Sequence, residues 1–282
     1  MKNSKIKIAW YGKHFGEEPP LVGFPQTSSF GRKRYGAGTI FFTGCNLRCV
    51  FCQNYQISQK GFGKEYSVPE LADIMLELQD NGALNIDLVT PTLWWEPLKE
   101  AIIQARNSKL NIPVVWNSNA YETLDIIRAM EGLVDIYLPD FKYMDDLLAL
   151  KYSNAPGYSG LAEQVIREMF RQVGILRIKN GLAEKGLLIR HLVLPGCIEN
   201  SFLVLERIAS IDKNIHLSLM NQYYPVYHSN KFTEINRRLT EKEVKAVEFK
   251  RIELGLENGW SQEADSGDVL LPDFCRENPF YI

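Results

Sequence analysis

The chain has 282 residues, of which 45% are hydrophobic and 23% are charged, and its formal net charge is −2. These values are ordinary for a globular protein, and a core of this size needs no disulfide to hold it together. The nearly neutral charge argues against a nucleic-acid partner, and no apolar run approaches the roughly 20 residues that cross a bilayer. The N-terminus also lacks the apolar core of a signal peptide. We therefore expect a cytoplasmic protein with reduced thiols and no membrane partner.

Short runs rich in apolar and β-branched residues recur along the chain and predict buried parallel strands. They span residues 38–44, 85–90, 112–118, 134–140, 186–196 and 214–220. Segments with helical periodicity separate or follow them, at residues 67–82, 96–108, 122–132, 161–174, 201–210 and 240–255. The first of these helices has Pro69 near its start and Gly82 just past its end, and the last begins with a Thr-x-x-Glu cap. The helix at 161–174 is an extra one within the long fourth crossover.

Six β/α units in succession predict an α/β fold with a parallel sheet and right-handed crossovers. Because eight units close a full barrel, we expect an open, six-stranded partial (β/α)6 barrel. The expected organisation is an N-terminal segment at residues 1–37, the partial barrel at 38–256 and a C-terminal extension at 257–282. The basic run at residues 31–34 is interpreted as a solvated loop.

Ligands of such sheets bind at the C-terminal ends of the strands. Polar side chains gather at those ends in this sequence, at Cys45, Thr90, Thr92, Asn117, Ser118, Asn119, Asp140, Lys142 and Gln222. Asp140 and Lys142 stand two residues apart, so we expect both to project to the same side and to pair. His191, within the fifth strand, is either a satisfied core residue or a member of the site, with Arg190 on the opposite face.

Some of these polar residues also have a purely structural interpretation. Residues 90–92 suit an ordinary turn, and residues 117–119 suit a cap for the helix that begins near Glu122. A polar segment precedes the first strand, and we interpret it as an exposed loop rather than a cover for the site. Its polar members are His14, Glu17 and Glu18.

Three of the five cysteines, Cys45, Cys49 and Cys52, are separated by only three and two residues. Cysteines scattered at random give this spacing in roughly one chain in a thousand, and clustered thiolates bind zinc or iron–sulfur clusters. Structural zinc takes four ligands, and no second pair of Cys or His stands nearby. Three thiolates leave one iron of a cubane cluster open to a ligand. Cys197 and Cys275 receive no role.

The motif "GCNLRCVFCQN" (44–54) resembles the signature of the radical S-adenosylmethionine (SAM) superfamily, with Phe51 just before the third cysteine. "CVFCQN" is similar to the Cys-x-aromatic-Cys-His-Asn of the activating enzymes of glycyl radical enzymes, with Gln53 in place of His. Further segments resemble uncharacterised homologues of pyruvate formate-lyase activating enzyme: "EEPPLVG", "VTPT", "LPDFKY", "LVLPG" and "SLMNQYYP". The resemblance covers most of the chain.

The resemblance implies that three thiolates hold a [4Fe–4S] cluster whose fourth iron is chelated by the amine and carboxylate of SAM. Reduction then yields methionine and a 5′-deoxyadenosyl radical. This radical abstracts hydrogen from a protein or peptide, such as a glycyl radical enzyme, or alternatively from a small-molecule metabolite. Flavodoxin or ferredoxin is implied as the electron donor. A third interpretation is a non-catalytic iron–sulfur or zinc protein.

The candidate site therefore combines cluster ligands with cofactor contacts. The cluster ligands are Cys45, Cys49 and Cys52, and the SAM contacts are Phe51, Asn54, Thr90, Thr92, Asn117, Ser118, Asn119, Asp140, Lys142, His191 and Gln222. Phe51 is expected to pack against adenine, and Gln222 to contact adenine or to line the substrate channel. The chain departs from the activating enzymes at residues 90–92, which replace a Gly-Gly-Glu-type turn. It departs again at Asn117, which replaces an Asp that helps to hold a monovalent cation.

Overall fold

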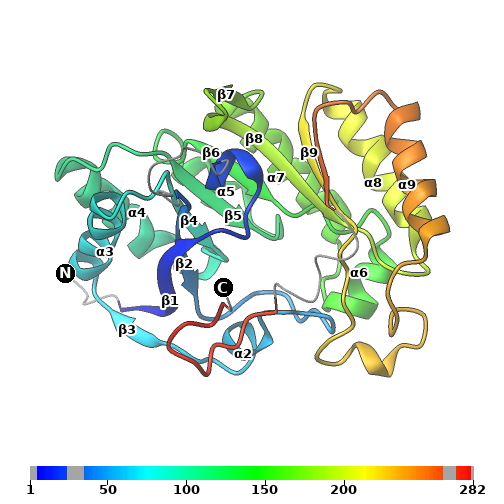
Figure 1. Ribbon diagram of the computed structural model, residues 1–282, viewed down its shortest axis with the longest axis horizontal. Helices are drawn as coiled ribbons and strands as arrows, with labels where there is room; N and C mark the ends of the chain where they lie inside the picture. Colours follow the sequence, from blue (N-terminus) through cyan, green and yellow to red (C-terminus); the bar gives the residue numbers. More distant parts are fainter. Residues whose placement is uncertain (1–4, 24–34, 263–270, 281–282) are drawn as a thin grey trace, which may run out of the picture.

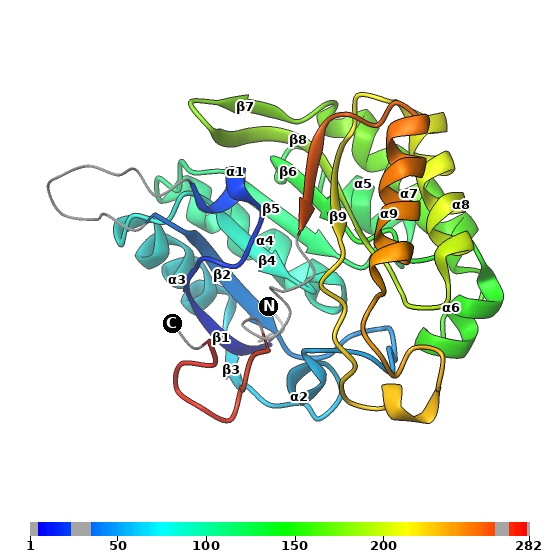
Figure 2. The ribbon, with the colours of Figure 1, turned by 45° about the vertical axis from the view of Figure 1, so that its right-hand side comes forward.

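The computed structural model describes residues 5–23, 35–262 and 271–280. Within these residues a ten-stranded sheet has the order β10-β9-β8-β6-β5-β4-β2-β1-β3, and β7 pairs with β8 beside this path (Figures 1 and 2). No helix of this part of the chain is long and apolar enough to cross a membrane. The basic run at 31–34 lies outside the described residues.

Six strands are those that the sequence predicts: β2 (Ala37–Phe42), β4 (Ile86–Val89), β5 (Val114–Ser118), β6 (Ile136–Pro139), β8 (Leu182–Leu192) and β9 (His216–Met220). They pair in parallel with one another in the order β2-β4-β5-β6-β8-β9. Every residue of β4, β5 and β6 is buried, as their apolar composition requires of strands covered on both faces. The prediction of an open, mostly parallel partial barrel is confirmed.

Four further strands were not predicted: β1 (Ile6–His14), β3 (Lys64–Tyr66), β7 (Arg177–Lys179) and β10 (Gly259–Gln262). β1 pairs antiparallel with β2 and β3, and β10 extends the parallel sheet beside β9. β7 and β8 form a hairpin at Asn180-Gly181, whose φ angles of 54° and 79° suit a tight two-residue turn. The sheet thus continues into both segments flanking the expected barrel, and the division into three parts stays a prediction.

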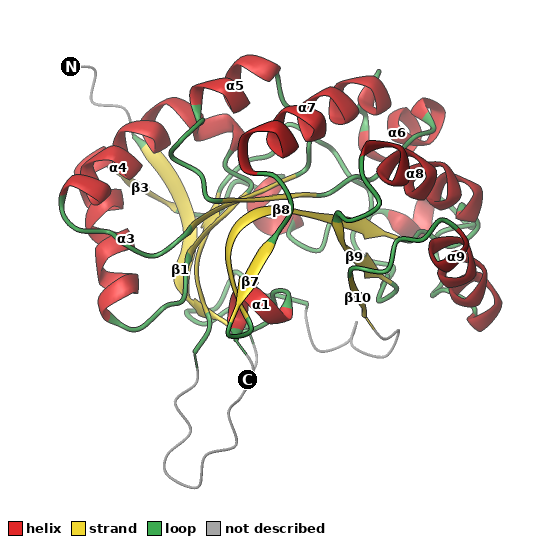
Figure 3. Cartoon of the chain, turned by 90° about the horizontal axis from the view of Figure 1, so that it is seen from above, coloured by secondary structure: helices red, strands yellow, loops and turns green. Residues whose placement is uncertain are grey.

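The predicted helices are α3 (Val68–Asp80), α4 (Trp95–Asn107), α5 (Leu124–Ala129), α7 (Tyr158–Val173), α8 (Ile198–Ile211) and α9 (Glu241–Glu253). Shorter helical elements are α1 (Pro19–Val22), α2 (Tyr55–Ser58), α6 (Asp146–Ser153), η1 (Thr92–Trp94) and η2 (Ser229–Lys231). Capping boxes fix the starts of α3 and α9, because the side chains of Ser67 and Thr240 accept from the backbone at Glu70 and Glu243. Figure 3 shows the long helices along the outer side of the curved sheet.

The short helix α1 lies on the opposite, inner side of the sheet, as Figure 3 shows. Leu21 of α1 is fully buried in an apolar cluster with residues of β5, β6 and β8, among them Val115 and Leu138. Asn85 Nδ2 donates a hydrogen bond to the Leu21 carbonyl at 2.8 Å. The chain that follows β1 is therefore anchored inside the barrel rather than on its surface.

A second distant segment, residues 271–280, returns to the barrel beside α2 (Figure 1). The side chain of Gln56 holds it, since Gln56 Oε1 accepts from Phe274 N at 2.7 Å and Gln56 Nε2 donates to Asp273 Oδ1 at 3.1 Å. Phe274 and Phe280 join an apolar cluster with Phe41 of β2. Both flanking segments thus reach the inside of the sheet, where the polar strand ends also lie.

Candidate functional site

The three clustered cysteines line one pocket at the carboxyl ends of the parallel strands. Their loop is fixed to the end of α6 by two backbone hydrogen bonds of 2.8 Å, from Arg48 N to Ser153 O and from Val50 N to Tyr152 O. Cys49 is buried, and Cys45 and Cys52 are partly buried. The loop therefore presents its sulfurs inward from a backbone that tertiary contacts hold in place.

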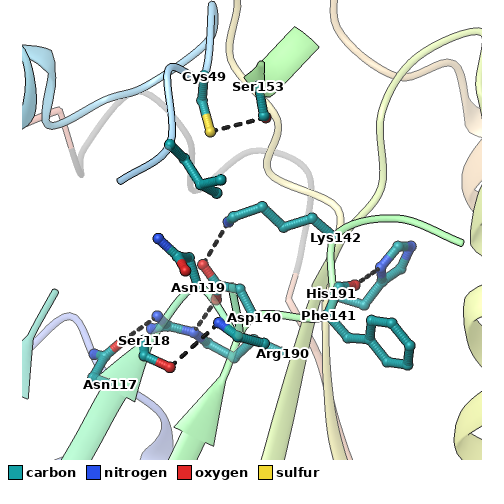
Figure 4. A network of polar contacts seen from close by, with 12 residues as sticks. Cys49, Asn117, Ser118, Asn119, Asp140, Phe141, Lys142, Ser153, Arg190 and His191 are labelled. Carbon is teal, nitrogen blue, oxygen red and sulfur yellow. Dashed lines mark hydrogen bonds and ion pairs between the residues drawn. The ribbon is translucent and has the colours of Figure 1, made fainter. Parts of the chain in front are cut away.

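Each of the three sulfurs has a side-chain hydrogen-bond partner. The pairs are Cys45 Sγ with Asn119 Nδ2 at 3.4 Å, Cys49 Sγ with Ser153 Oγ at 3.0 Å, and Cys52 Sγ with Ser58 Oγ at 3.3 Å. Asn119 and Ser153 belong to other β/α units than the cysteine loop, and Figure 4 shows Ser153 facing Cys49. Hydrogen bonds to ligand sulfurs are one of the means by which proteins set the reduction potential of an iron–sulfur cluster.

Burial raises the pKa of the Cys49 thiol to about 12 and that of Cys52 to about 11, and it also raises the pKa of Cys45. The positive charge of Lys142 acts in the opposite direction at all three sulfurs. Because metal ligation requires thiolates, an ammonium group beside the pocket favours the ligating form.

Two kinds of metal centre differ in how their cysteine ligands are arranged. Within the residues that the structure describes, no group of three His, Cys, Asp or Glu side chains is placed to bind a metal ion. Thiolates on one zinc ion each lie about 2.3 Å from it and so crowd together, whereas thiolates of a cubane bind different irons and stand farther apart. The three cysteines share one pocket, and their three thiolates match the number that holds a cubane with one open iron.

Asp140 lies at the centre of a chain of charges beside the cysteines (Figure 4). Its Oδ2 accepts from Lys142 Nζ at 2.6 Å, as the sequence predicts, and its Oδ1 accepts from Arg190 Nε at 2.7 Å. Burial alone would raise the pKa of Asp140, but the charges of Arg190 and Lys142 hold it below its usual value. The carboxylate is therefore ionised and fixes both cations.

Of the two neighbours in β8, Arg190 faces the pocket and His191 does not. Arg190 lines the pocket, contacts Glu17 Oε2 at 3.4 Å and donates to Asn117 Oδ1. His191 points to the helix side, where its Nδ1 lies 2.7 Å from Phe141 O and its Nε2 lies 2.9 Å from Ser201 Oγ. Burial lowers the pKa of His191 to about 4, so its ring is neutral. Of its two possible roles, His191 takes that of a satisfied core residue.

The polar segment before the first predicted strand is not an exposed loop. His14, Glu17 and Glu18 line the pocket, and the side chain of Glu17 is only 8% exposed. Glu17 faces His14 Nδ1 at 3.5 Å as well as Arg190, and these partners lower its pKa although burial acts to raise it. The interpretation failed because the barrel supplies a buried arginine that no local pattern reveals.

Most of the other predicted site residues also line this pocket. They are Phe51, Asn54, Thr90, Asn117, Ser118, Asn119, Lys142 and Gln222. Phe51 meets Tyr223 edge to face, with ring centroids 5.8 Å apart. Thr90 has a φ of 61°, which places it in the left-handed region at the end of β4.

Thr92 is the second predicted residue that does not line the pocket. Its Oγ1 donates to Glu122 Oε1 at 2.9 Å, and Trp116 Nε1 donates to the same oxygen at 3.0 Å. Ser118 Oγ donates to the other oxygen of Glu122 at 2.7 Å. This buried carboxylate ties the ends of β4 and β5 together, and sequence reasoning noted it only as the start of a helix.

Comparison with known proteins places this geometry in a family. A model described as the radical SAM superfamily matches residues 39–179. An uncharacterized protein of Methanocaldococcus jannaschii is 34% identical over 263 residues, which cover 87% of this chain and 68% of that protein. The chain therefore belongs to the radical SAM superfamily. The cofactors of that family, and of this chain as its member, are a [4Fe–4S] cluster and SAM.

Solved structures share the fold at low sequence identity. SuiB of Streptococcus suis superposes with a TM-score of 0.55 at 13% identity, covering 78% of this chain and 47% of SuiB. SuiB bound to S-adenosylmethionine gives a TM-score of 0.54 at 12% identity, covering 80% and 48%. The chain thus spans about half the length of SuiB. A domain of pyruvate-formate lyase-activating enzyme from Bacteroides vulgatus gives 0.46 at 15% identity, covering 61% and 94%.

Proposed function

We propose that the protein is a radical SAM enzyme in which Cys45, Cys49 and Cys52 hold the [4Fe–4S] cluster. The bound cluster and SAM supply one-electron chemistry that yields a 5′-deoxyadenosyl radical, which abstracts hydrogen from a substrate. The observation that carries this proposal is the set of three cysteines on one wall of a pocket at the carboxyl ends of the strands.

In this proposal the chain's own residues bind and orient SAM, and they exclude water from the pocket. Lys142 is fixed by Asp140 and binds the carboxylate of SAM in this proposal, and Phe51 packs against its adenine. The further proposed contacts are Asn54, Thr90, Asn117, Ser118, Asn119 and Gln222. Thr92 and His191 are not among them, because their polar atoms are committed to partners outside the pocket.

The test is reductive cleavage of SAM by anaerobically reconstituted protein with dithionite, measured as 5′-deoxyadenosine by liquid chromatography. Cys45→Ala is expected to abolish both the product and the iron–sulfur absorption. Cys197→Ala is the matched control, since Cys197 is a buried cysteine outside the pocket and its loss should leave both unchanged. Intact, cluster-loaded protein that forms no 5′-deoxyadenosine contradicts the proposal.

Two substrate classes remain candidates. The resemblance to activating enzymes supports a protein or peptide, such as a glycyl radical enzyme. A small-molecule metabolite is supported by the enclosure of the pocket, because residues of the N-terminal segment and Pro272 and Phe280 of the C-terminal segment all line it. Deuterium transfer into 5′-deoxyadenosine from a labelled candidate substrate separates the two. A flavodoxin or ferredoxin donor fits the family, and a cytoplasmic location stays a prediction.

A further inference from the structure

The cysteine loop has two faces, and only the inner face belongs to the pocket. Between Cys45 and Phe51 the positions that line the pocket alternate with positions that do not, which are Asn46, Arg48 and Val50. The proposed function puts SAM and the substrate against the inner face, and it consumes one electron for each SAM that is cleaved. Because the inner face is then covered, the outer face is the one open to a protein that delivers the electron.

The outer face of the loop carries exposed positive charge. Arg48 is exposed, and its Nη1 donates to Cys45 O and to Gln59 Oε1, both at 3.0 Å. Lys60 follows Gln59 in the chain and is also exposed, with its Nζ 4.9 Å from the centre of the Tyr55 ring. Neither cation has a carboxylate partner among the described residues. A single hydrogen bond therefore joins an unpaired surface guanidinium to a residue that is proposed to hold the cluster.

Three stacked rings lie against the same face of the loop. Tyr55 of α2 stacks on Tyr227 with centroids 4.8 Å apart and an angle of 13° between the rings, and Tyr227 stacks on His228 at 3.8 Å. His228 N donates to Val50 O at 2.8 Å, so the segment that follows β9 is fixed to the cysteine loop and lies beside α2 (Figure 2). The three rings are half-buried, and none lines the pocket. Tyrosine and arginine are both enriched in protein–protein interfaces.

Tyr227 is held in an unfavourable backbone conformation. Its φ of 56° lies in the left-handed region, which is uncommon for a residue with a bulky side chain. Such strain persists only where the surrounding structure imposes it, and it concentrates at functional sites. Tyr227 belongs to none of the buried apolar clusters of the described residues. Its conformation therefore shapes the surface of the cysteine loop rather than the packing of the core.

We propose that an acidic one-electron carrier protein docks on this surface, which we call the outer patch and define as Arg48, Tyr55, Lys60, Tyr227 and His228. The redox group of the carrier loses one electron and the cluster gains it. A polypeptide substrate fits the outer patch less well, because its reacting atom has to reach the inner face of the loop. The assignment rests on the proposed function, because it takes the three cysteines to hold the cluster that is reduced.

The experiment measures how fast reduced flavodoxin of net negative charge reduces the cluster, followed by flavin absorbance in a stopped-flow instrument with SAM present. Lys60→Glu replaces attraction by repulsion and should lower the second-order rate constant about fivefold or more at low ionic strength. Sodium chloride at about 0.5 M should shrink the difference to less than about twofold, because it screens the charges. Lys213→Glu is the matched control, since this exposed lysine precedes β9 at the opposite ends of the strands, and it should change the rate less than about twofold.

Reduction by dithionite separates docking from the cluster itself. Dithionite is a small reductant that needs no docking surface, so it should reduce Lys60→Glu and the natural protein at rates within about twofold of each other. Arg48→Gln removes a charge but keeps a hydrogen-bond donor for Cys45 O. It should slow flavodoxin about threefold or more, and it decides the matter if Lys60→Glu does not fold.

Three results would overturn the proposal: equal rate constants for Lys60→Glu and Lys213→Glu, a rate with dithionite that falls as much as the rate with flavodoxin, or a natural protein that only dithionite reduces. The readout is reduction of the cluster and not turnover. Reduction by flavodoxin at the expected rates without formation of 5′-deoxyadenosine would therefore refute the proposed function alone.

Discussion

The cysteine loop and the acidic residues Glu17 and Glu18 share one pocket, but they are held in different ways. In the loop each sulfur already has a side-chain hydrogen-bond partner. Glu17 is held instead by charged partners, since its carboxylate faces His14 Nδ1 at 3.5 Å and Arg190 Nη1 at 3.4 Å. The loop therefore suits a group that binds through metal–sulfur bonds, and the hydrogen bonds to the sulfurs adjust the reduction potential of that group. Glu17 depends on Arg190, and Arg190 also binds Asp140, so these two residues connect the two regions.

Removing that connection should have the largest effect. Arg190→Leu removes the guanidinium that two buried carboxylates, Asp140 and Glu17, share, so we expect the free energy of unfolding to fall by about 3–5 kcal/mol. Urea denaturation of the purified variant measures it. Arg207→Leu is the comparison, because the ion pair of Arg207 with Glu163 is 40% exposed on the arginine side and should be worth about 1 kcal/mol or less. Equal losses in the two variants would show that Arg190 does not hold the regions together.

A substitution of Lys142 tests the part of the pocket that lies nearer the cysteines. Lys142→Met keeps the length of the side chain but removes the charge beside the thiols and the proposed partner of the SAM carboxylate. Loss of one charged hydrogen bond is worth about 1.5–3 kcal/mol, so the Kd for SAM should rise about 10- to 100-fold. Equilibrium dialysis of the cluster-loaded variant measures the change, and an unaltered Kd removes Lys142 from the cofactor site.

The two aspartates should respond to pH with opposite signs. The pKa of Asp140 is lowered in the folded protein, so its stabilising charge is present above its ordinary pKa of 3.8 and is lost as the pH falls through the lower folded value. The pKa of Asp87 is raised, so the folded protein loses stability as the pH rises from 3.8 toward the higher folded value. Each slope is at most about 1.4 kcal/mol per pH unit.

Denaturation of two variants across the pH range sharpens this contrast. Asp140→Asn should lose stability relative to the natural protein at pH 7, with the difference shrinking below pH 3.8. Asp87→Asn should gain relative stability as the pH rises from 4 toward 8, because the amide cannot be forced to ionise. Parallel pH profiles for the two variants would mean that Asp87 and Asp140 do not differ in charge state.

Ser153→Ala is expected to change the cluster rather than the fold. The hydroxyl of Ser153 lies 3.0 Å from Cys49 Sγ, and a hydrogen bond to a cluster sulfur favours the reduced, more negative state. A preference of about 0.5–1 kcal/mol for that state corresponds to roughly 20–40 mV in a one-electron couple, so the variant should have a more negative potential by about that amount. Redox titration followed by electron paramagnetic resonance measures the shift, and Ser210→Ala on the surface is the control.

The smallest expected effect concerns the monovalent cation that the resemblance to activating enzymes implies. Both oxygens of Asp140 accept from Lys142 and Arg190, and Asn117 Oδ1 accepts from Arg190. With a guanidinium already on these oxygens, exchange of sodium for potassium should leave the rate of 5′-deoxyadenosine formation unchanged within about twofold. A strong dependence on one of the two ions would show that the cation site is kept.

The sequence predicted what local patterns determine. Apolar runs in the sequence predict the six parallel strands, and the close spacing of the three cysteines predicts the metal site. β1 was missed because Lys7, Gly12 and Lys13 interrupt its apolar run, and β10 because it is short. Neither strand has a pattern of its own, and both are stabilised by pairing with the sheet.

The rest of the site depends on contacts between distant positions. Alternation along β8 puts Arg190 and His191 on opposite faces of the strand, but it does not tell which of them faces the inside of the barrel. A buried arginine is stable there only if carboxylates from other parts of the chain lie beside it. Glu17, the partner that does so, lies 173 positions away. Thr92 was misplaced for a similar reason, because the carboxylate that binds it follows the next strand.

The attachment of residues 271–280 to Gln56 has a consequence for how the protein is made. The contact from Gln56 to Asp273 joins positions 217 residues apart. At about 5–20 residues per second, a ribosome adds the closing segment roughly 10–40 s after the cysteines have emerged. During that interval Pro272 and Phe280 are missing from the pocket wall, so the nascent chain leaves its thiols open to the machinery that delivers iron and sulfide.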